Sequence, residues 1–202
     1  IGYTALGDNT TADSNTAVGY LALRLNTTGS ENTAVGTSAL DANTTGGNNT
    51  AVGHNALTAN TTAANNTAFG KSTLQSVTTG SANTGLGKEA GGAITTGDFN
   101  TFVGVAGFAT TTASANTGVG YNTMATNTTG DDNVAVGRQA MLLNATGGNN
   151  VSVGSFSLDA NTTGGFNTAL GRSALTANTT ASNNTAVGAS ALGANTTGAN
   201  NV

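Results

Sequence analysis

The side chains that most often do chemistry are scarce in this chain. His54 is the only histidine, cysteine is absent, and Lys and Arg together number five. One histidine with no recurring carboxylate or serine beside it cannot make a catalytic triad or a histidine-based metal site. Glycine pairs such as Gly91-Gly92 lack the Lys-Ser/Thr that follows in a phosphate-binding loop. We therefore expect no enzyme, no cofactor and no bound metal.

Charge is also scarce, at 7% of residues with a net charge of −4. Binding to a phosphate backbone needs clustered Lys and Arg, so we expect no nucleic-acid partner. No run of 18 apolar residues occurs, and we expect no membrane span in this segment. The chain opens on Ile1, which indicates a segment of a longer fibre. Because the chain has no cysteine, its sequence does not indicate an oxidising or a reducing compartment.

The chain is one short segment written repeatedly. An asparagine starts each repeat, and the step is 17 residues except for one step of 16 between Asn100 and Asn116. A fixed short period is typical of a solenoid, in which each turn contacts mainly its neighbours. We number the columns of the repeat 1 to 17 from this asparagine and predict a single repeat domain over residues 1–202, with about twelve turns. The starts are Asn15, Asn32, Asn49, Asn66, Asn83, Asn100, Asn116, Asn133, Asn150, Asn167, Asn184 and Asn201.

The composition of each turn predicts strands. Gly and Asn disfavour helix interiors, and Thr and Val are stiff at χ1. Two short segments per turn, Thr-Ala-Val and Ala-Leu-x-Ala, alternate in polarity between Gly or Asn residues, as short strands joined by tight turns do. We predict an all-β parallel β-solenoid, or β-roll. The fourth column, mostly Val, and the ninth, mostly Leu, are expected to form its core.

Two kinds of column are nearly invariant. The fifth is glycine in every turn, as at Gly36 and Gly53, which fits a positive φ or the close approach of another backbone. The first and most of the twelfth are asparagine. Stacked turns place identical side chains about 4.8 Å apart, so these asparagines are expected to form amide ladders. The ladder candidates are Asn32 and Asn49 in the first column and Asn43 and Asn60 in the twelfth.

Some of these asparagines also lie in glycosylation sequons, such as Asn26-Thr27-Thr28 and Asn161-Thr162-Thr163. A glycan-carrying role is therefore an alternative to the structural ladder. The repeat produces the sequon in turn after turn, whatever the host.

The variable columns are expected to face solvent. Lys71, Lys88, Arg138 and Arg172 all occupy the sixth column. The same columns hold exposed aromatics that would suit docking to a host surface glycan or protein, namely Tyr20, Tyr121, Phe99 and Phe166. A solvated face is the alternative.

The third column is mostly alanine and points to the opposite side of the strand from the fourth. We expect Ala34, Ala51 and Ala186 to face a neighbouring copy, since alanine permits close lateral contact. In the short repeat, Gly107-Phe108 replaces the usual Ala-Leu. We expect Phe99, Phe102 and Phe108 to fill the space left by the missing Leu at Gly91.

The Asn-Thr-Ala-Val-Gly unit followed by Ala-Leu, as in Asn32 to Leu40, Asn49 to Leu57 and Asn184 to Leu192, resembles the head repeats of trimeric autotransporter adhesins of the YadA type. It is also similar to repeats of phage tail fibres. The resemblance implies a left-handed parallel β-roll, a homotrimer or filament, and a location outside the cell or on a virion.

These observations favour a structural function, an extracellular fibre or adhesin shaft that extends and displays a binding surface. The alternative is a carbohydrate-binding or glycan-carrying attachment module. An ice-binding protein is disfavoured, because the paired threonines are adjacent in sequence and Val follows two residues after the other Thr column, which leaves a single file of Thr on each face.

Overall fold

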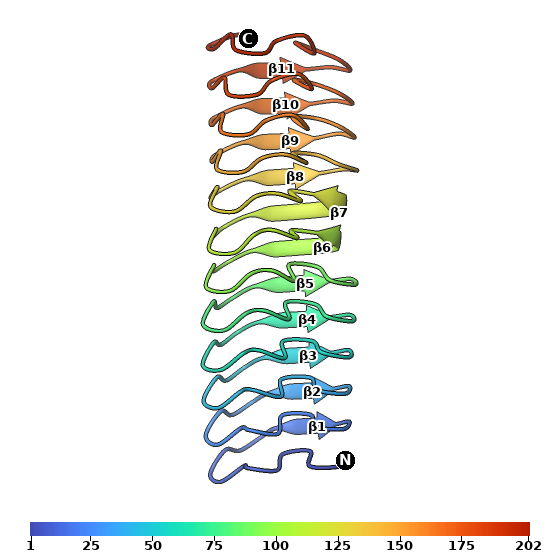
Figure 1. Ribbon diagram of the computed structural model, residues 1–202, viewed down its shortest axis with the longest axis vertical. Helices are drawn as coiled ribbons and strands as arrows, with labels where there is room; N and C mark the ends of the chain where they lie inside the picture. Colours follow the sequence, from blue (N-terminus) through green and yellow to red (C-terminus); the bar gives the residue numbers. More distant parts are fainter. The chain divides into compact units, whose positions relative to one another are not determined.

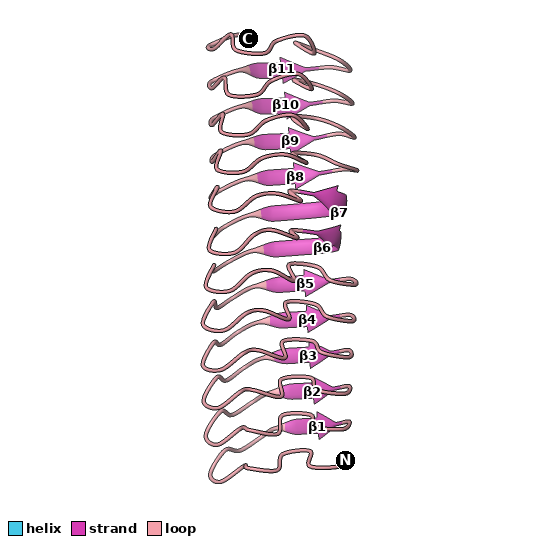
Figure 2. Ribbon diagram, in the orientation of Figure 1, coloured by secondary structure: helices cyan, strands magenta, loops and turns pink.

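The computed structural model describes residues 1–202 and is all-β, with eleven parallel strands forming a β-solenoid (Figures 1 and 2). This confirms the predicted fold class, with eleven strand-bearing turns where about twelve turns were expected. No helix suited to crossing a membrane is present. The chain divides into two compact units, Ile1–Asn100 and Thr101–Val202, which are described in turn. The left-handed coil implied by the resemblance stays a prediction.

The first unit contains five strands of three residues, and neighbours in the chain pair in parallel. The register advances by one repeat, so that Thr33 pairs with Thr50, Ala34 with Ala51 and Val35 with Val52. Each column therefore stacks on itself from turn to turn. The strands are β1 (Thr16–Val18), β2 (Thr33–Val35), β3 (Thr50–Val52), β4 (Thr67–Phe69) and β5 (Thr84–Leu86).

Each turn has one strand, not the two that were predicted. The Ala-Leu-x-Ala segment forms tight turns instead, because its leucine adopts a left-handed conformation, with φ of 52° at Leu40 and 50° at Leu57. A residue with positive φ cannot continue an extended strand. The segment still hydrogen-bonds along the stack, as in the N–H of Leu40 donating to the Ala56 carbonyl at 3.0 Å.

The core consists of the third, eighth and ninth columns. Ala34, Ala39 and Leu40 are fully buried. The predicted placement of the fourth-column valines in the core is wrong, and so is the predicted contact of Ala34, Ala51 and Ala186 with another copy, because these alanines lie inside their own coil. A three-residue strand can turn only its middle side chain inward, and the ninth-column leucine already fills the interior opposite.

The second unit contains six strands, of which the first two are longer. β6 and β7 pair in parallel with a register shift after Val105, where Ala106 pairs with Thr123 and Asn122 is passed over. The residue missing from the 16-residue repeat is therefore that of the seventh column. The strands are β6 (Thr101–Ala106), β7 (Thr117–Thr123), β8 (Val134–Val136), β9 (Val151–Val153), β10 (Thr168–Leu170) and β11 (Thr185–Val187).

The Phe102 side chain fills the interior of this short turn. Its ring is fully buried, and a Cβ built on Gly107, in the ninth column, would lie 2.8 Å from ring atoms of Phe102. The ring thus occupies the space that a ninth-column leucine fills in other turns. The predicted packing at Gly91 is wrong for Phe99, which is 68% exposed. Phe108 is only half-buried, and the buried ring of Phe102 lies against Gly107 of its own turn. The alignment of Gly107-Phe108 with Ala-Leu is also wrong, since Ala106-Gly107 takes that place.

Candidate functional site

The first-column asparagines form a continuous buried ladder in each unit. The side-chain amide of Asn49 donates to the Ala63 carbonyl at 2.8 Å and to Asn32 Oδ1 at 3.1 Å. Its own Oδ1 accepts the backbone N–H of Asn66 at 3.0 Å. Each asparagine therefore links its turn to both neighbours. Because these groups are buried and hydrogen-bonded, they stabilise the register of the stack.

The twelfth-column asparagines form a second ladder, which is interrupted where the column holds Val77, Ile94 and Thr110. Asn60 Nδ2 donates to Asn43 Oδ1 at 2.8 Å, and Asn43 Nδ2 donates to the Gly46 carbonyl at 2.9 Å. The sequon asparagines Asn26 and Asn161 are fully buried in this ladder, and their Nδ2 atoms donate to the carbonyls of Gly29 and Gly164. A glycan on either nitrogen would displace these bonds in the folded chain, which argues against the glycan-carrying alternative.

Gly36 and Gly53 support the stack through the backbone. Their φ angles are 137° and 140°, a region that residues with a Cβ rarely adopt. A Cβ on Gly53 would lie 2.3 Å from the carbonyl oxygen of Gly70 in the next turn. The fifth column thus meets both requirements at once, a positive φ and a close backbone approach.

The outward side of the strands is an apolar surface that sequence reasoning missed. We call it the strand face, and it consists of the second and fourth columns. Phe69 is 53% and Leu86 48% exposed on it in the first unit, and Val153, Leu170 and Val187 are exposed on it in the second. Neither column contains a charged residue in any turn. The strand face is therefore apolar, uncharged and unpartnered in the single chain.

One signal in the sequence could have found this face. The fourth column accepts Val, Phe and Leu, which differ in volume, whereas the third accepts only Ala, Gly or Ser except at Phe102. A packed interior tolerates changes of volume poorly, and a solvent-facing position does not feel them. Variation in size, rather than hydrophobicity, distinguishes the outward column from the inward one.

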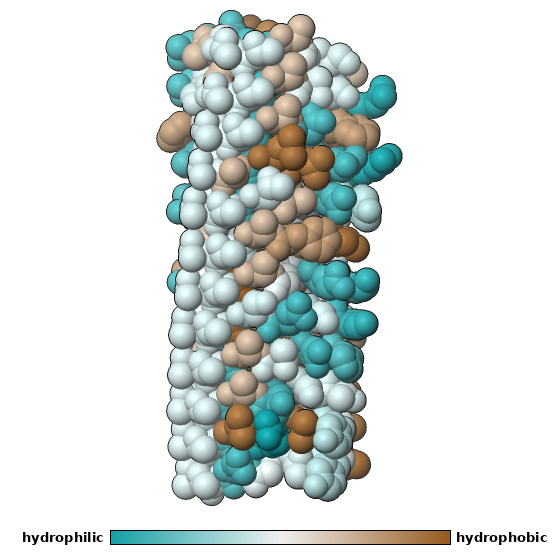
Figure 3. Space-filling view, viewed as in Figure 1, coloured by the Kyte–Doolittle hydropathy of each residue, from teal (hydrophilic) through white to brown (hydrophobic).

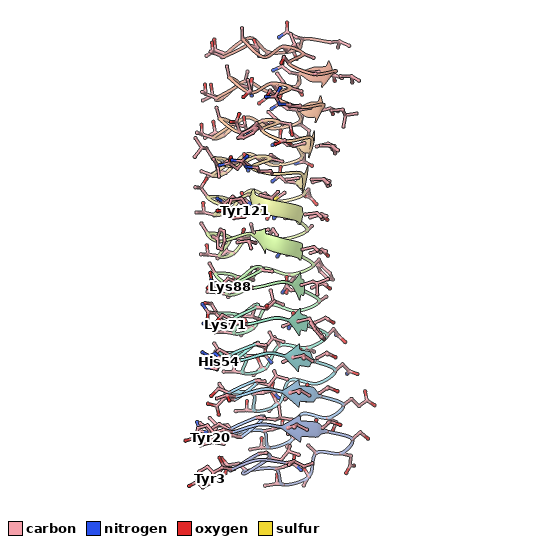
Figure 4. All side chains as sticks on the ribbon, turned by 90° about the vertical axis from the view of Figure 1, so that its right-hand side faces the viewer. Tyr3, Tyr20, His54, Lys71, Lys88 and Tyr121 are labelled. Atoms are coloured by element: carbon pink, nitrogen blue, oxygen red, sulfur yellow. The ribbon has the colours of Figure 1, made fainter.

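The sixth column forms a file that we call the variable edge. In the first unit Tyr3, Tyr20, His54, Lys71 and Lys88 follow one another along it (Figure 4). Tyr3, which sequence reasoning did not single out, stacks on Tyr20 with ring centroids 5.6 Å apart. Hydrophilic side chains gather along the side where the strands end (Figure 3). In the first unit the members are Tyr3, Tyr20, Thr37, His54, Lys71 and Lys88, and in the second Val105, Tyr121, Arg138, Ser155, Arg172 and Ala189.

The four aromatics chosen from the sequence are all exposed, but the structure does not bring them together. Tyr20 and Tyr121 lie in the sixth column, Tyr20 after β1 and Tyr121 within β7. Phe99 and Phe166 lie in the seventeenth column, before the strand of the next turn. Neither unit therefore places a tyrosine and a phenylalanine of this set in one aromatic platform.

Ion pairs are few. Arg24 Nε donates a hydrogen bond to Asp41 Oδ1 at 2.7 Å, and this bond, together with the negative charge of Asp41, raises the pKa of Arg24. Lys88 Nζ lies 3.3 Å from Glu89 Oε1 at the surface. No group of three or more His, Asp or Glu residues is placed to hold a metal ion.

Comparisons with protein-family models, with curated proteins and with solved structures gave no match. Two surfaces then stand out on geometry, the strand face and the variable edge. The strand face offers apolar contact area, and the variable edge offers hydrogen-bond donors and positive charge.

Proposed function

We propose that this chain is a structural repeat module, an extracellular fibre or adhesin shaft that associates with copies of itself through the strand face and displays the variable edge. The exposed, uncharged strand face carries the proposal, because it recurs in both units on a backbone fixed by two asparagine ladders. The resemblance to adhesin heads points to three copies and to a cell surface or virion.

The size of the strand face supports burial against a partner. A phenylalanine side chain can bury about 150–250 Å², so Phe69 at 53% exposure offers roughly 100 Å². Five turns of Thr and Val, Leu or Phe in the first unit then expose several hundred Å², which is the size of the largest patches on soluble monomers. Each unit by itself thus offers a substantial part of the roughly 800 Å² per partner that a stable interface buries.

The periodicity of the strand face favours a second copy as the partner. Its apolar side chains repeat with the strand spacing of about 4.8 Å, and another copy carries the same spacing over its whole length. A column of like charges would repel itself in such a pairing, and neither column carries any.

The oligomeric state tests this proposal. We expect the 202-residue chain to sediment as an oligomer and the double variant Val35→Glu/Val52→Glu to sediment as a monomer. Burying unpaired carboxylates at the interface should weaken association at least about 100-fold. Both valines face outward, so the circular dichroism spectrum and the melting temperature should change little.

A matched control is Thr28→Glu/Thr45→Glu, which adds the same charge at exposed positions of the fourteenth column. This variant should still form the oligomer. A wild-type chain that stays monomeric at high concentration, or a valine variant that still associates, would contradict the proposal.

Ice binding gains no support from the geometry. The strand face has one file of Thr beside larger, uneven side chains such as Phe69 and Leu86, which prevent a flat match to a lattice. The paired threonines lie in bends rather than in a strand, and the hydroxyl of the first in each pair is engaged along the stack, as in Thr44 Oγ1 donating to the Thr61 carbonyl at 3.0 Å.

A further inference from the structure

We propose that the variable edge of the first unit binds a linear anionic polysaccharide, which lies along the file from Tyr3 to Lys88. This inference goes beyond the structural function and does not depend on self-association. It rests on three features of the edge: its regular backbone, its segregated positive charge and its complete set of hydrogen-bond donors.

The backbone fixes the spacing of the file. From Tyr3 to Lys71, the carbonyl of each sixth-column residue accepts the N–H of the seventh-column residue of the next turn. Ser38 donates to the Tyr20 carbonyl at 2.8 Å, Ser72 to that of His54 at 2.8 Å, and Glu89 to that of Lys71 at 2.9 Å. All six side chains of the file are exposed. The edge is therefore preorganised, which lowers the entropy lost when a ligand binds.

Positive charge is concentrated on this edge. Four of the five Lys and Arg residues of the chain occupy the sixth column, and none of its positions is acidic. The remaining cation, Arg24, is paired with Asp41. Lys71 forms no ion pair, and it follows His54 and precedes Lys88 in consecutive turns. The edge thus offers cationic groups in register, and its own column contains no carboxylate. The one acidic contact is that of Lys88 with the seventh-column Glu89, at 3.3 Å on the surface.

The side chains of the file recognise acceptors. Tyr, Thr, His and Lys all donate hydrogen bonds, and Lys adds charge to the bond it makes with a carboxylate. Tyr3 and Tyr20 stack with an interplanar angle of 13°. Their facing surfaces are covered by each other, so the pair presents hydroxyl groups, ring edges and at most one outer face of each ring to a ligand.

A polyuronate fits this pattern better than a nucleic acid. One sugar residue of an extended polysaccharide is about as long as the strand spacing of about 4.8 Å, so successive sugars can meet successive turns. Each uronic acid carries a carboxylate and hydroxyl groups that accept hydrogen bonds. Single-stranded nucleic acids are held by bases stacked on open aromatic faces and by many phosphate contacts. Two tyrosines stacked on each other leave too few open faces for a run of stacked bases, and the two lysines of this unit supply few phosphate contacts.

The second unit repeats the arrangement independently. Tyr121 is followed one turn later by Arg138 and, after Ser155, by Arg172 in the same column. Arg138 lies over the Phe156 ring, 5.1 Å from its centroid, which orients the guanidinium through a cation–π contact. A tyrosine followed by cations therefore appears on the variable edge of both units.

Binding of oligogalacturonate to the immobilised 202-residue chain tests the inference. We expect saturable binding at low ionic strength that is lost in about 1 M salt and that is absent for the fully methyl-esterified, neutral oligomer. In a background of Arg138→Gln/Arg172→Gln, which removes the cations of the second unit, Lys71→Gln/Lys88→Gln should weaken the affinity at least about tenfold. The Lys71→Arg/Lys88→Arg variant should retain it.

The control for net charge is Thr45→Glu/Thr79→Glu, which lowers the charge by the same two units on another side of the coil. It should change the affinity less than about threefold, because solvent screens distant charges. Equal loss in both double variants, equal binding of the neutral oligomer, absence of binding, or tighter binding of oligo-dT would each overturn the inference. Sedimentation of the Val35→Glu/Val52→Glu variant tests self-association separately, so its outcome does not depend on whether the chain binds a polysaccharide.

Discussion

Replacing Gly53 by alanine is expected to destabilise the fold by about 3 kcal/mol or more. The new Cβ would lie 2.3 Å from the Gly70 carbonyl oxygen, and the φ of 140° is one that alanine rarely adopts. The clash involves backbone on both sides, so no side chain can move to relieve it. Thermal unfolding followed by circular dichroism should show a melting temperature lower by roughly 10 °C, or no soluble folded protein.

Gly188→Ala separates the two causes. Gly188 has a similar φ of 129°, but a Cβ there would meet only the Ala191 Cβ, at 3.9 Å. This variant should lose only the conformational part, about 1–2 kcal/mol. Equal destabilisation of the two variants would show that the close approach between turns contributes nothing.

Ala34→Arg is expected to prevent folding of the turns around β2. Ala34 is fully buried between Ala17 and Ala51 in the stack, with no room for a longer side chain and no acid to pair with a guanidinium. An unpaired buried charge costs several kcal/mol and overpacking adds about 1–3 kcal/mol, against a typical stability of about 5–15 kcal/mol. Far-ultraviolet circular dichroism and resistance to protease should both fall sharply.

The neighbouring substitution Val35→Arg is the matched control, because Val35 points to the other side of the same strand. It should leave the fold intact. If Ala34→Arg instead remained folded and only lost its association with other copies, the alanine column would be the contact surface that its sequence pattern first indicated.

The fold class followed from the sequence because its determinants are local and repeated. A 17-residue step fixes which residues stack, and the parallel pairing of Thr33 with Thr50 is the direct consequence. The invariant glycine and asparagine columns pointed to positions of special backbone geometry and of amide bonding. At Gly53 and Asn49 these demands arise within two adjacent turns, so a repeat pattern contains enough information to predict them.

The direction in which the strand side chains point could not be predicted from the sequence. Hydrophobicity favours Val35 over Ala34 for the interior, but a narrow coil already filled by Leu40 leaves room only for a methyl group on the strand side. The positive φ of Leu40 could not be predicted either, since leucine gives no local signal for a left-handed conformation and adopts it here because burial and stacking outweigh the strain.

The candidate contact surface was predicted in part. Exposure of Tyr20 and Phe99 followed from their variable columns, whereas their separation by the strand depends on how the turn is folded. The stacking of Tyr3 on Tyr20 could be recognised only once the structure showed that the sixth-column side chains lie along one edge.

The central claim is that the strand face points outward from the single chain and is buried against the strand face of another copy. Because the chain has no cysteine, single variants Val35→Cys, Ala34→Cys and Thr45→Cys allow the rate of thiol labelling to be measured at one position at a time. We expect Val35→Cys to label quickly in dilute solution and more slowly as protein concentration rises, Thr45→Cys to label quickly at every concentration, and Ala34→Cys to stay slow throughout. Fast labelling of Ala34→Cys with slow labelling of Val35→Cys in dilute solution, or a rate at Val35→Cys that does not depend on concentration, would contradict the claim.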